Sequence, residues 1–285
     1  MRTISLLGIP NDDNSSLLKG TAEAPALIRA ELHSAGHTSW TESGVDLGLD
    51  GRFEDCGDIP FDGTCDPWDL IEQHVGNALQ SGNPLISLGG DHAITHPIMR
   101  AVRRRHSNLC ILHIDAHPDI YHTYQNNPRS HTSPFARIME EGLADRLIQV
   151  GLRTINDHHR DQFRRFGVEA IDAGRCGQPI RLKLTTPVYI SLDIDALDPA
   201  FAPGVSHREP GGLSTRQVID LIHAIDQPIV AADIVEYNPR CDIANITALV
   251  AAKLLKEIAG MMVTTHGEER TAKSISYEVK DGGHA

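Results

Sequence analysis

Short apolar runs alternate with helical patterns along most of the chain. Several runs are apolar at nearly every position, as in residues 109–114, which is typical of strands covered on both faces. The runs that predict strands are residues 3–9, 84–88, 109–114, 147–150, 188–192 and 229–235. The segments that predict helices are residues 25–32, 69–80, 134–141, 215–225 and 245–259. The pattern therefore predicts an α/β protein of three layers, αβα, with a mainly parallel central sheet.

The domain organisation follows from the same pattern. The chain has 285 residues, a length that α/β folds often use for one unit, and no repeat or linker divides it. We predict a single domain over residues 1–262. Residues 263–285 are polar and lack clear periodicity, so we predict a C-terminal tail there. The alternative is a segment that packs on a neighbouring subunit.

Charge and cysteine content narrow the class of protein. The formal net charge is -12 and no basic run offsets it, so we expect neither a nucleic-acid partner nor an anionic membrane partner. A small cationic substrate suits this charge. No run approaches about 18 apolar residues, so no membrane span is predicted. The five cysteines are odd in number and lack CxxC spacing, which argues against a disulfide framework and for a reducing cytoplasm.

Acidic and histidine side chains gather after three of the predicted strands. They are Asp91 and His92, then Asp115, His117 and Asp119, then Asp193 and Asp195. In an open parallel sheet, ligands bind at the carboxyl ends of the strands, which share one edge. Residues i and i+2 of an extended chain point the same way, so each cluster can face a common crevice. Each cluster alone would also fit a helix cap or a turn, but three such strand ends together favour one site.

The ligand types in these clusters indicate a kind of metal. Four carboxylates and two imidazoles without a thiolate favour a hard divalent ion such as Mn²⁺ over structural zinc. Because a carboxylate can bridge two ions, this set suffices for two ions per subunit. Four aspartates, two dications and one hydroxide give a net charge of about -1, which matches a substrate of charge +1. Such ions ionise water at neutral pH and so supply a nucleophile.

The motifs that carry these residues resemble those of a known family. Gly-Gly-Asp-His at 89–92, His-Ile-Asp-Ala-His-Pro-Asp at 113–119 and Ser-Leu-Asp-Ile-Asp-Ala-Leu-Asp-Pro at 191–199 are similar to the three signatures of the ureohydrolases, the arginase and agmatinase family. The resemblance runs from Leu7 to about Met262 and implies an arginase-like fold for that domain. It is greatest to plant-type arginases, through residues 117–122, 130–131, 135–140 and 198–207.

The resemblance also implies a role for each site residue. One Mn²⁺ would be bound by His92 and Asp119 and the other by His117 and Asp195, with Asp115 and Asp193 bridging both. His131 matches the family's active-site histidine, which exchanges protons with solvent. Asp119 would deliver a proton to the leaving amine. Glu236, after the predicted strand 229–235, matches the carboxylate that binds the guanidinium.

The implied reaction is hydrolysis of a guanidinium compound to urea and an amine. L-Arginine is the first candidate substrate, with agmatine and guanidinobutyrate as alternatives. We expect the arginine carboxylate to be recognised by the loop 121–129, through Asn126, Asn127 and Arg129, and by Asn156. The resemblance implies a homo-oligomer, either a trimer or a hexamer. The competing classes are a deacetylase-like amidohydrolase with one zinc ion and a non-catalytic metal-binding protein.

Eight further histidines are expected to be structural or exposed. They are His96, His106, His113, His122, His158, His159, His207 and His223.

Overall fold

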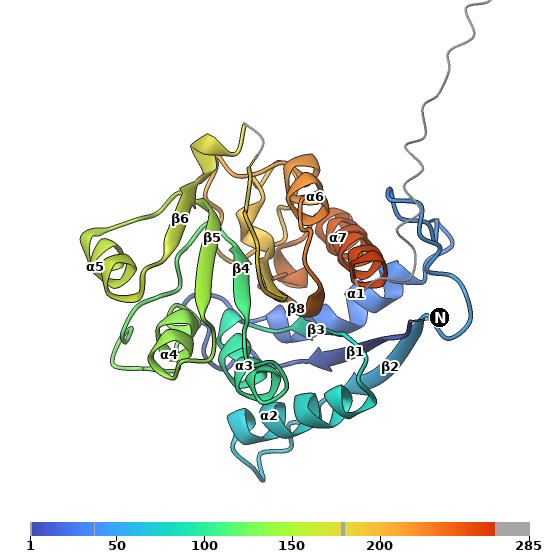
Figure 1. Cartoon of the computed structure of the whole chain (residues 1–285), viewed down its shortest axis with the longest axis horizontal. Helices are drawn as coiled ribbons and strands as arrows, with labels where there is room; N and C mark the ends of the chain where they lie inside the picture. The colour runs from blue at the N-terminus through green and yellow to red at the C-terminus, as the bar shows by residue number, and fades with distance from the viewer. Residues whose placement is uncertain (1, 37, 178–179, 266–285) are drawn as a thin grey trace, which may run out of the picture.

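Eight parallel strands form one sheet in the computed structural model, which describes residues 2–36, 38–177 and 180–265 (Figure 1). Their order across the sheet is β2-β1-β3-β8-β7-β4-β5-β6, and every neighbouring pair is parallel. The strands are β1 (Ile4–Ile9), β2 (Phe53–Asp58), β3 (Leu85–Gly89), β4 (Cys110–Ile114), β5 (Arg146–Leu152), β6 (Glu169–Asp172), β7 (Val188–Asp193) and β8 (Ile229–Val235). The predicted parallel sheet is therefore confirmed.

Helices cover both faces of the sheet and complete the three predicted layers. One face carries α1 (Ala24–Leu32), α6 (Thr215–His223) and α7 (Ile246–Thr264), whose apolar residues share one core cluster with alternate strand residues. The other face carries α2 (Pro67–Ala78), α3 (Thr95–Arg103), α4 (Pro134–Glu140) and α5 (Asp157–Phe166), which pack on a second cluster. Because both faces are buried, the inner strands are mostly apolar, as the sequence pattern predicts, and the few polar side chains in them, such as Ser191 and Asp233, are buried too.

Four elements of the structure were not predicted from the sequence pattern, each for a physical reason. Strands β2 and β6 form the two edges of the sheet, and most of their side chains are exposed or half-buried, so no apolar run marks them. Helix α5 contains little apolar surface and begins at a capping box made by Asn156 and His159. Helix α3 carries Pro97 in its first turn, which disguises its start.

The C-terminal part of the described chain is one long helix. Helix α7 continues beyond the predicted end at Ala259 to Thr264. Most of the predicted tail, residues 266–285, lies outside the described residues. In the part of the chain that the structure describes, no helix has the length and apolar character needed to cross a membrane.

The topology brings four central strands to one edge. Strands β3, β8, β7 and β4 are consecutive neighbours in the sheet, and all four run in the same direction. Their carboxyl ends therefore lie side by side, and these are the strand ends that carry the acidic and histidine clusters and Glu236.

Candidate active site

His92 and three aspartates surround one candidate metal position. His92 Nδ1 lies 3.0 Å from Asp119 Oδ2, and 3.2 Å from both Asp115 Oδ2 and Asp193 Oδ2. All four side chains are buried, and His92 Nδ1 has no hydrogen-bond partner. One nitrogen and three carboxylate oxygens that converge in a buried place fit a hard divalent ion.

A second group adjoins the first. His117 Nδ1 lies 3.1 Å from Asp195 Oδ2 and 3.5 Å from Asp115 Oδ1. Asp115 thus offers a different oxygen to each group, as a bridging carboxylate would. Asp193 directs Oδ2 to the first group, whereas its Oδ1 accepts a hydrogen bond from the Asp195 backbone at 2.7 Å. Bridging by Asp193 stays a prediction.

The electrostatics of these groups also fit a cation. Burial lowers the pKa of His92, but Asp115, Asp119 and Asp193 outweigh burial and raise that pKa well above its usual value. Burial and the neighbouring carboxylates of Asp195 and Asp115 raise the pKa of Asp193 well above its usual value. Both shifts have one origin, which is negative charge concentrated away from water. Divalent cations would relieve this repulsion.

Asp91, the acidic residue beside His92, belongs to neither ligand group. Its Oδ1 accepts a hydrogen bond from Ala93 N and caps the short helix His92–Ile94. Its Oδ2 accepts a hydrogen bond from Asn14 N at 2.8 Å. The helix-cap interpretation of Asp91 is therefore the one that the structure supports, and the residue also anchors the loop that carries Ser16.

Ser16, His131 and Glu236 form a hydrogen-bonded row. His131 Nδ1 lies 2.9 Å from Glu236 Oε1, and His131 Nε2 lies 2.8 Å from Ser16 Oγ. Glu236 Oε1 also accepts a hydrogen bond from His92 N at 2.9 Å. Burial lowers the pKa of His131, but the Glu236 carboxylate, helped by Asp119, raises it to about 9. Glu236 thus holds His131 in its protonated form, with Nδ1 as a donor.

The backbone is strained at two of these residues. Asp119 has φ 43° and Glu236 has φ 62°, which is the left-handed region that non-glycine residues rarely adopt. Such a conformation costs on the order of 1–3 kcal/mol and persists where the surroundings hold it in place. Strain at two acidic residues that line the same cavity is typical of a functional site.

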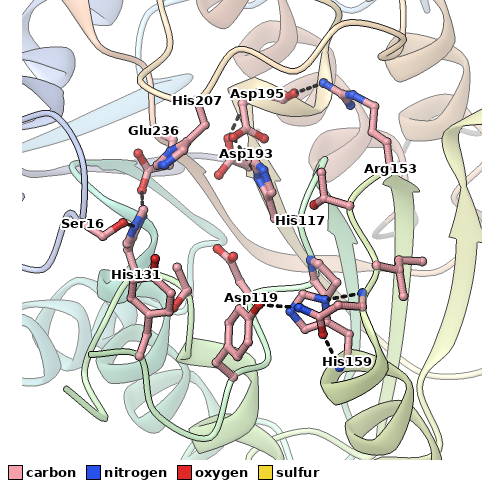
Figure 2. Close-up of a pocket in the computed structure, with 17 residues that line it drawn as sticks. Ser16, His117, Asp119, His131, Arg153, His159, Asp193, Asp195, His207 and Glu236 are labelled. Carbon is pink, nitrogen blue, oxygen red and sulfur yellow. Dashed lines mark hydrogen bonds and ion pairs between the residues drawn. The ribbon is translucent and has the colours of Figure 1, made fainter. Parts of the chain in front are cut away.

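One cavity of about 460 Å³ is lined by members of both ligand groups, namely Asp119 and Asp193 of the first and His117 and Asp195 of the second, and by the row of Ser16, His131 and Glu236. Figure 2 shows Ser16, His131 and Glu236 along one side, and His117, Asp193 and Asp195 across from them. The remaining described wall includes polar and aromatic side chains, namely Tyr121, Tyr124, Thr154, Asn156, His159 and His207, and the cation Arg153. The cavity therefore has an acidic floor and an outer wall without carboxylates among its described residues.

The donors predicted in the loop 121–129 are placed elsewhere. Arg129 donates to Asp66 at 2.8 Å, and its guanidinium lies over the Trp68 ring at 4.8 Å. Asn127 donates to Asn14 at 3.1 Å. Arg129, Asn127 and Asn126 are not among the described residues that line the cavity, so their part in binding the carboxylate stays a prediction. The same loop contributes Tyr121 and Tyr124 instead.

Asn156 does line the cavity. Its amide donates to Tyr121 Oη at 2.6 Å, and its Oδ1 caps α5 by accepting from His159 N. Arg153 also borders the cavity, but its guanidinium donates to backbone carbonyls, among them those of Asp195 and Ala196. The Arg153 guanidinium therefore holds the segment that contains Asp195, a member of the second ligand group, and is not left to bind a substrate.

Three histidines expected to be structural or exposed belong to the site. His113 Nε2 lies 2.7 Å from Asp115 Oδ2, and His207 and His159 line the cavity. His207 also packs near His131, with ring centroids 5.6 Å apart. The signal for His113 was present, because it precedes Asp115 by two residues and shares its face of the strand. Nothing in the local sequence marks His159 or His207.

The fold and the site together define a class of protein. A parallel α/β sheet carries two adjoining groups of carboxylates and imidazoles at its carboxyl edge, beside a cavity with a further buried carboxylate. Paired groups of this kind suit metal-dependent hydrolysis.

Comparison with known proteins identifies the family. The family model described as "Arginase family" matches residues 2–260. Two arginases of Arabidopsis thaliana are similar, Arginase 1 at 45% identity over 90% of this chain and 80% of the relative, and Arginase 2 at 44% over 91% and 80%. The solved arginase from Medicago truncatula superimposes with a TM-score of 0.87 at 42% identity, covering 92% of this chain and 87% of the other. The chain belongs to the arginase family.

The relatives correct the prediction of compartment. The two Arabidopsis proteins are named mitochondrial and chloroplastic/mitochondrial, which contradicts the predicted cytoplasmic location. The cysteine argument fails because five unpaired thiols require only a reducing environment, and the cytoplasm is not the only such compartment.

Proposed function

We propose that this protein hydrolyses the guanidinium group of L-arginine to give L-ornithine and urea, with two Mn²⁺ ions per subunit. The observation that carries the proposal is that Glu236 lines one cavity together with members of both ligand groups. A guanidinium bound to Glu236 would lie between that carboxylate and the ions. The sequence similarity to plant arginases supports arginine as the substrate.

The ligand sets support manganese. His92 and Asp119 would hold one ion, His117 and Asp195 the other, and Asp115 and Asp193 would lie between them. The donors are oxygen and imidazole nitrogen without a thiolate, which suits a hard divalent ion. When bound, such a pair lowers the pKa of water and supplies the nucleophile.

The protein's own residues would bind the substrate and move protons. Both hydrogen bonds that His92 and His131 make with Glu236 involve Oε1, which leaves Oε2 for the guanidinium. A carboxylate bound to a planar guanidinium fixes the position of its carbon. His131 carries a proton beside the cavity, and Ser16 Oγ continues the row. Asp119 would pass a proton to the departing amine, and His131 would exchange protons with solvent.

The outer wall of the cavity bears on the choice of substrate. The Arg153 guanidinium is committed to backbone carbonyls, so an arginine carboxylate would be bound by neutral donors such as Asn156 and Tyr121. Agmatine lacks that carboxylate and would gain nothing from these donors. The presence of these donors favours arginine over agmatine. Guanidinobutyrate, which has a carboxylate but no amine beside it, is a further alternative.

The test is the ratio of kcat/KM for arginine and agmatine, measured by urea release with Mn²⁺ added. We expect arginine to be preferred. A matched variant is Asn156→Asp, which can still cap α5 through its carboxylate but adds a negative charge to the outer wall. It should lower kcat/KM for arginine more than for agmatine. A wild-type ratio that favours agmatine would overturn the choice of substrate.

The oligomeric state belongs to the same proposal. By resemblance to the family we propose a trimer or hexamer, which sedimentation equilibrium of the full chain would distinguish from a monomer.

A further inference from the structure

A buried carboxylate lies behind the His92 group and belongs to neither ligand group. Asp233 on β8 is fully buried, and no described Lys, Arg or His forms an ion pair with it. Three hydroxyl groups contact it instead. Ser191 Oγ lies 2.7 Å from Asp233 Oδ1, Thr95 Oγ1 lies 2.7 Å from Oδ2, and the Tyr189 hydroxyl also donates to Oδ2. A buried carboxylate without a cation is costly, and this cost points to a role.

One of these hydroxyls connects Asp233 to His92. Ser191 Oγ lies 2.9 Å from His92 Nε2, and both side chains are fully buried. Ser191 is on β7 and Asp233 on the neighbouring β8, where the two residues pair in register. The row His92–Ser191–Asp233 therefore crosses two central strands directly beneath the first ligand group.

Metal binding through His92 selects one arrangement of the protons in this row. Ser191 donates its single hydroxyl proton to Asp233, so Ser191 Oγ can only accept from His92. His92 therefore keeps a proton on Nε2. A bound ion would replace the proton on the other nitrogen, Nδ1, and use its lone pair. That is the nitrogen that lies 3.0 Å from Asp119 Oδ2 and lacks a hydrogen-bond partner.

We propose that Asp233, acting through Ser191, is a positioning residue that holds His92 in the tautomer and orientation that bind the metal ion. The charge of Asp233 polarises the Ser191 hydroxyl, which strengthens the hydrogen bond from His92 Nε2 and makes Nδ1 a better ligand. The inference rests on the metal centre of the proposed function.

The test measures metal affinity, with Asp233→Asn and Ser191→Ala as the two variants. In Asp233→Asn the amide oxygen can still accept from Ser191, while the amide nitrogen faces Thr95 and Tyr189, so shape is kept and charge is lost. Ser191→Ala removes the connection itself. Thr95→Val is the matched control, because it removes a hydroxyl donor from the same carboxylate, while the Thr95 hydroxyl makes no hydrogen bond with the His92 ring and the backbone contact of Thr95 N with His92 O is kept. Mn²⁺ binding to the full-length protein is followed by isothermal titration calorimetry and by metal content after dialysis.

We expect both variants to bind one of the two ions about 10–100-fold more weakly than wild type and the other with nearly unchanged affinity. Thr95→Val should lower the melting temperature and leave both affinities within about threefold. Unchanged affinities in Ser191→Ala and Asp233→Asn would overturn the inference, as would an equal loss in Thr95→Val, which would indicate a structural role only. If Asp233→Asn does not fold, Ser191→Ala decides alone, since it is the smaller change.

Wild-type protein separates this inference from the proposed function. A wild type that binds fewer than two Mn²⁺ ions contradicts the metal centre itself. A wild type that binds two ions, with variants that bind them equally well, contradicts only the role of Asp233.

Discussion

Replacing Glu236 with Gln should remove the charge that is expected to bind the guanidinium and preserve the surrounding geometry. The amide oxygen of Gln can accept the same two hydrogen bonds, from His92 N and His131 Nδ1. Glu236 is 4% exposed, so its charge acts in a largely desolvated site. Truncating one partner of a buried, hydrogen-bonded charge pair costs about 2–5 kcal/mol, so kcat/KM for arginine should fall at least about 30-fold.

The assay is urea release under Mn²⁺ saturation, with metal content measured on the same samples. Glu236 lies in neither ligand group, so the variant should retain its metal. Glu169→Gln is the control, because it makes the same chemical change at an exposed site. Glu169 lies on the edge strand β6 and pairs with Arg146 of β5. The control variant should alter kcat/KM by less than about twofold. A metal-loaded Glu236→Gln enzyme with nearly wild-type kcat/KM would refute the assigned role.

Three further changes test other parts of the structure. Asp115→Asn or Asp193→Asn should abolish metal binding and urea release together, and either variant with full metal content and full activity would contradict the two-ion site. His96 accepts a hydrogen bond from Trp68 Nε1, and burial lowers its pKa from 6.5 to about 4. The pKa of His96 is lower in the folded state than in the unfolded state, so below pH 6.5 the unfolded chain binds a proton at His96 that the folded protein does not. The free energy of unfolding should therefore fall by about 3 kcal/mol as the pH falls from 6.5 to 4. Chemical denaturation at both pH values should show this loss in wild type and a smaller one in His96→Gln. Arg153→Ala should lower the free energy of unfolding by about 1.5–3 kcal/mol, because the Arg153 guanidinium donates to the carbonyls of Asp195 and Ala196. An unchanged denaturation midpoint would show that these hydrogen bonds do not stabilise the fold.

The strand ends were predictable from the sequence because the signal is local. Buried parallel strands are mostly apolar, and polar residues that follow such a run lie at the carboxyl edge. His92, Asp115 and Asp193 were predicted in this way. In the structure, Asp115 Oδ2 and Asp193 Oδ2 each lie 3.2 Å from His92 Nδ1. The edge strand β2 was missed for the converse reason, since its exposed side chains leave no apolar run.

The outer wall of the cavity was not predictable because it depends on contacts between distant segments. The loop 121–129 is turned by contacts of Arg129 with Asp66 and of Asn127 with Asn14. Those partners precede the loop by 63 and 113 positions. Ser16 meets His131 across 115 positions. No spacing rule within a motif reports on such pairs. Asn156 was predicted from the sequence, whereas the positions of Tyr124, His159 and His207 in the outer wall emerged only from the structure.

The glycine pair before His92 shows why one of these long-range contacts is possible. A Cβ atom at Gly90 would lie 1.8 Å from the backbone oxygen of Asn11, so any side chain must displace the loop that follows β1. That loop is tied to the same place by a hydrogen bond from Asp91 N to Asn11 O at 3.0 Å. It also carries Ser16 to His131. Gly90 is therefore required for close approach and not for a left-handed backbone.

Gly90→Ala should consequently damage stability and catalysis together. Forcing a methyl group into this backbone contact should cost about 1–3 kcal/mol of unfolding free energy. The displaced loop should also separate Ser16 from His131 and lower kcat. Gly76→Ala is the matched control, since a Cβ there, in the interior of α2, meets nothing within 4 Å. It should stabilise the protein by about 0.5–1 kcal/mol through helix propensity and leave kcat unchanged. Equal melting temperatures for the two variants would show that the overlap at Asn11 is relieved without cost.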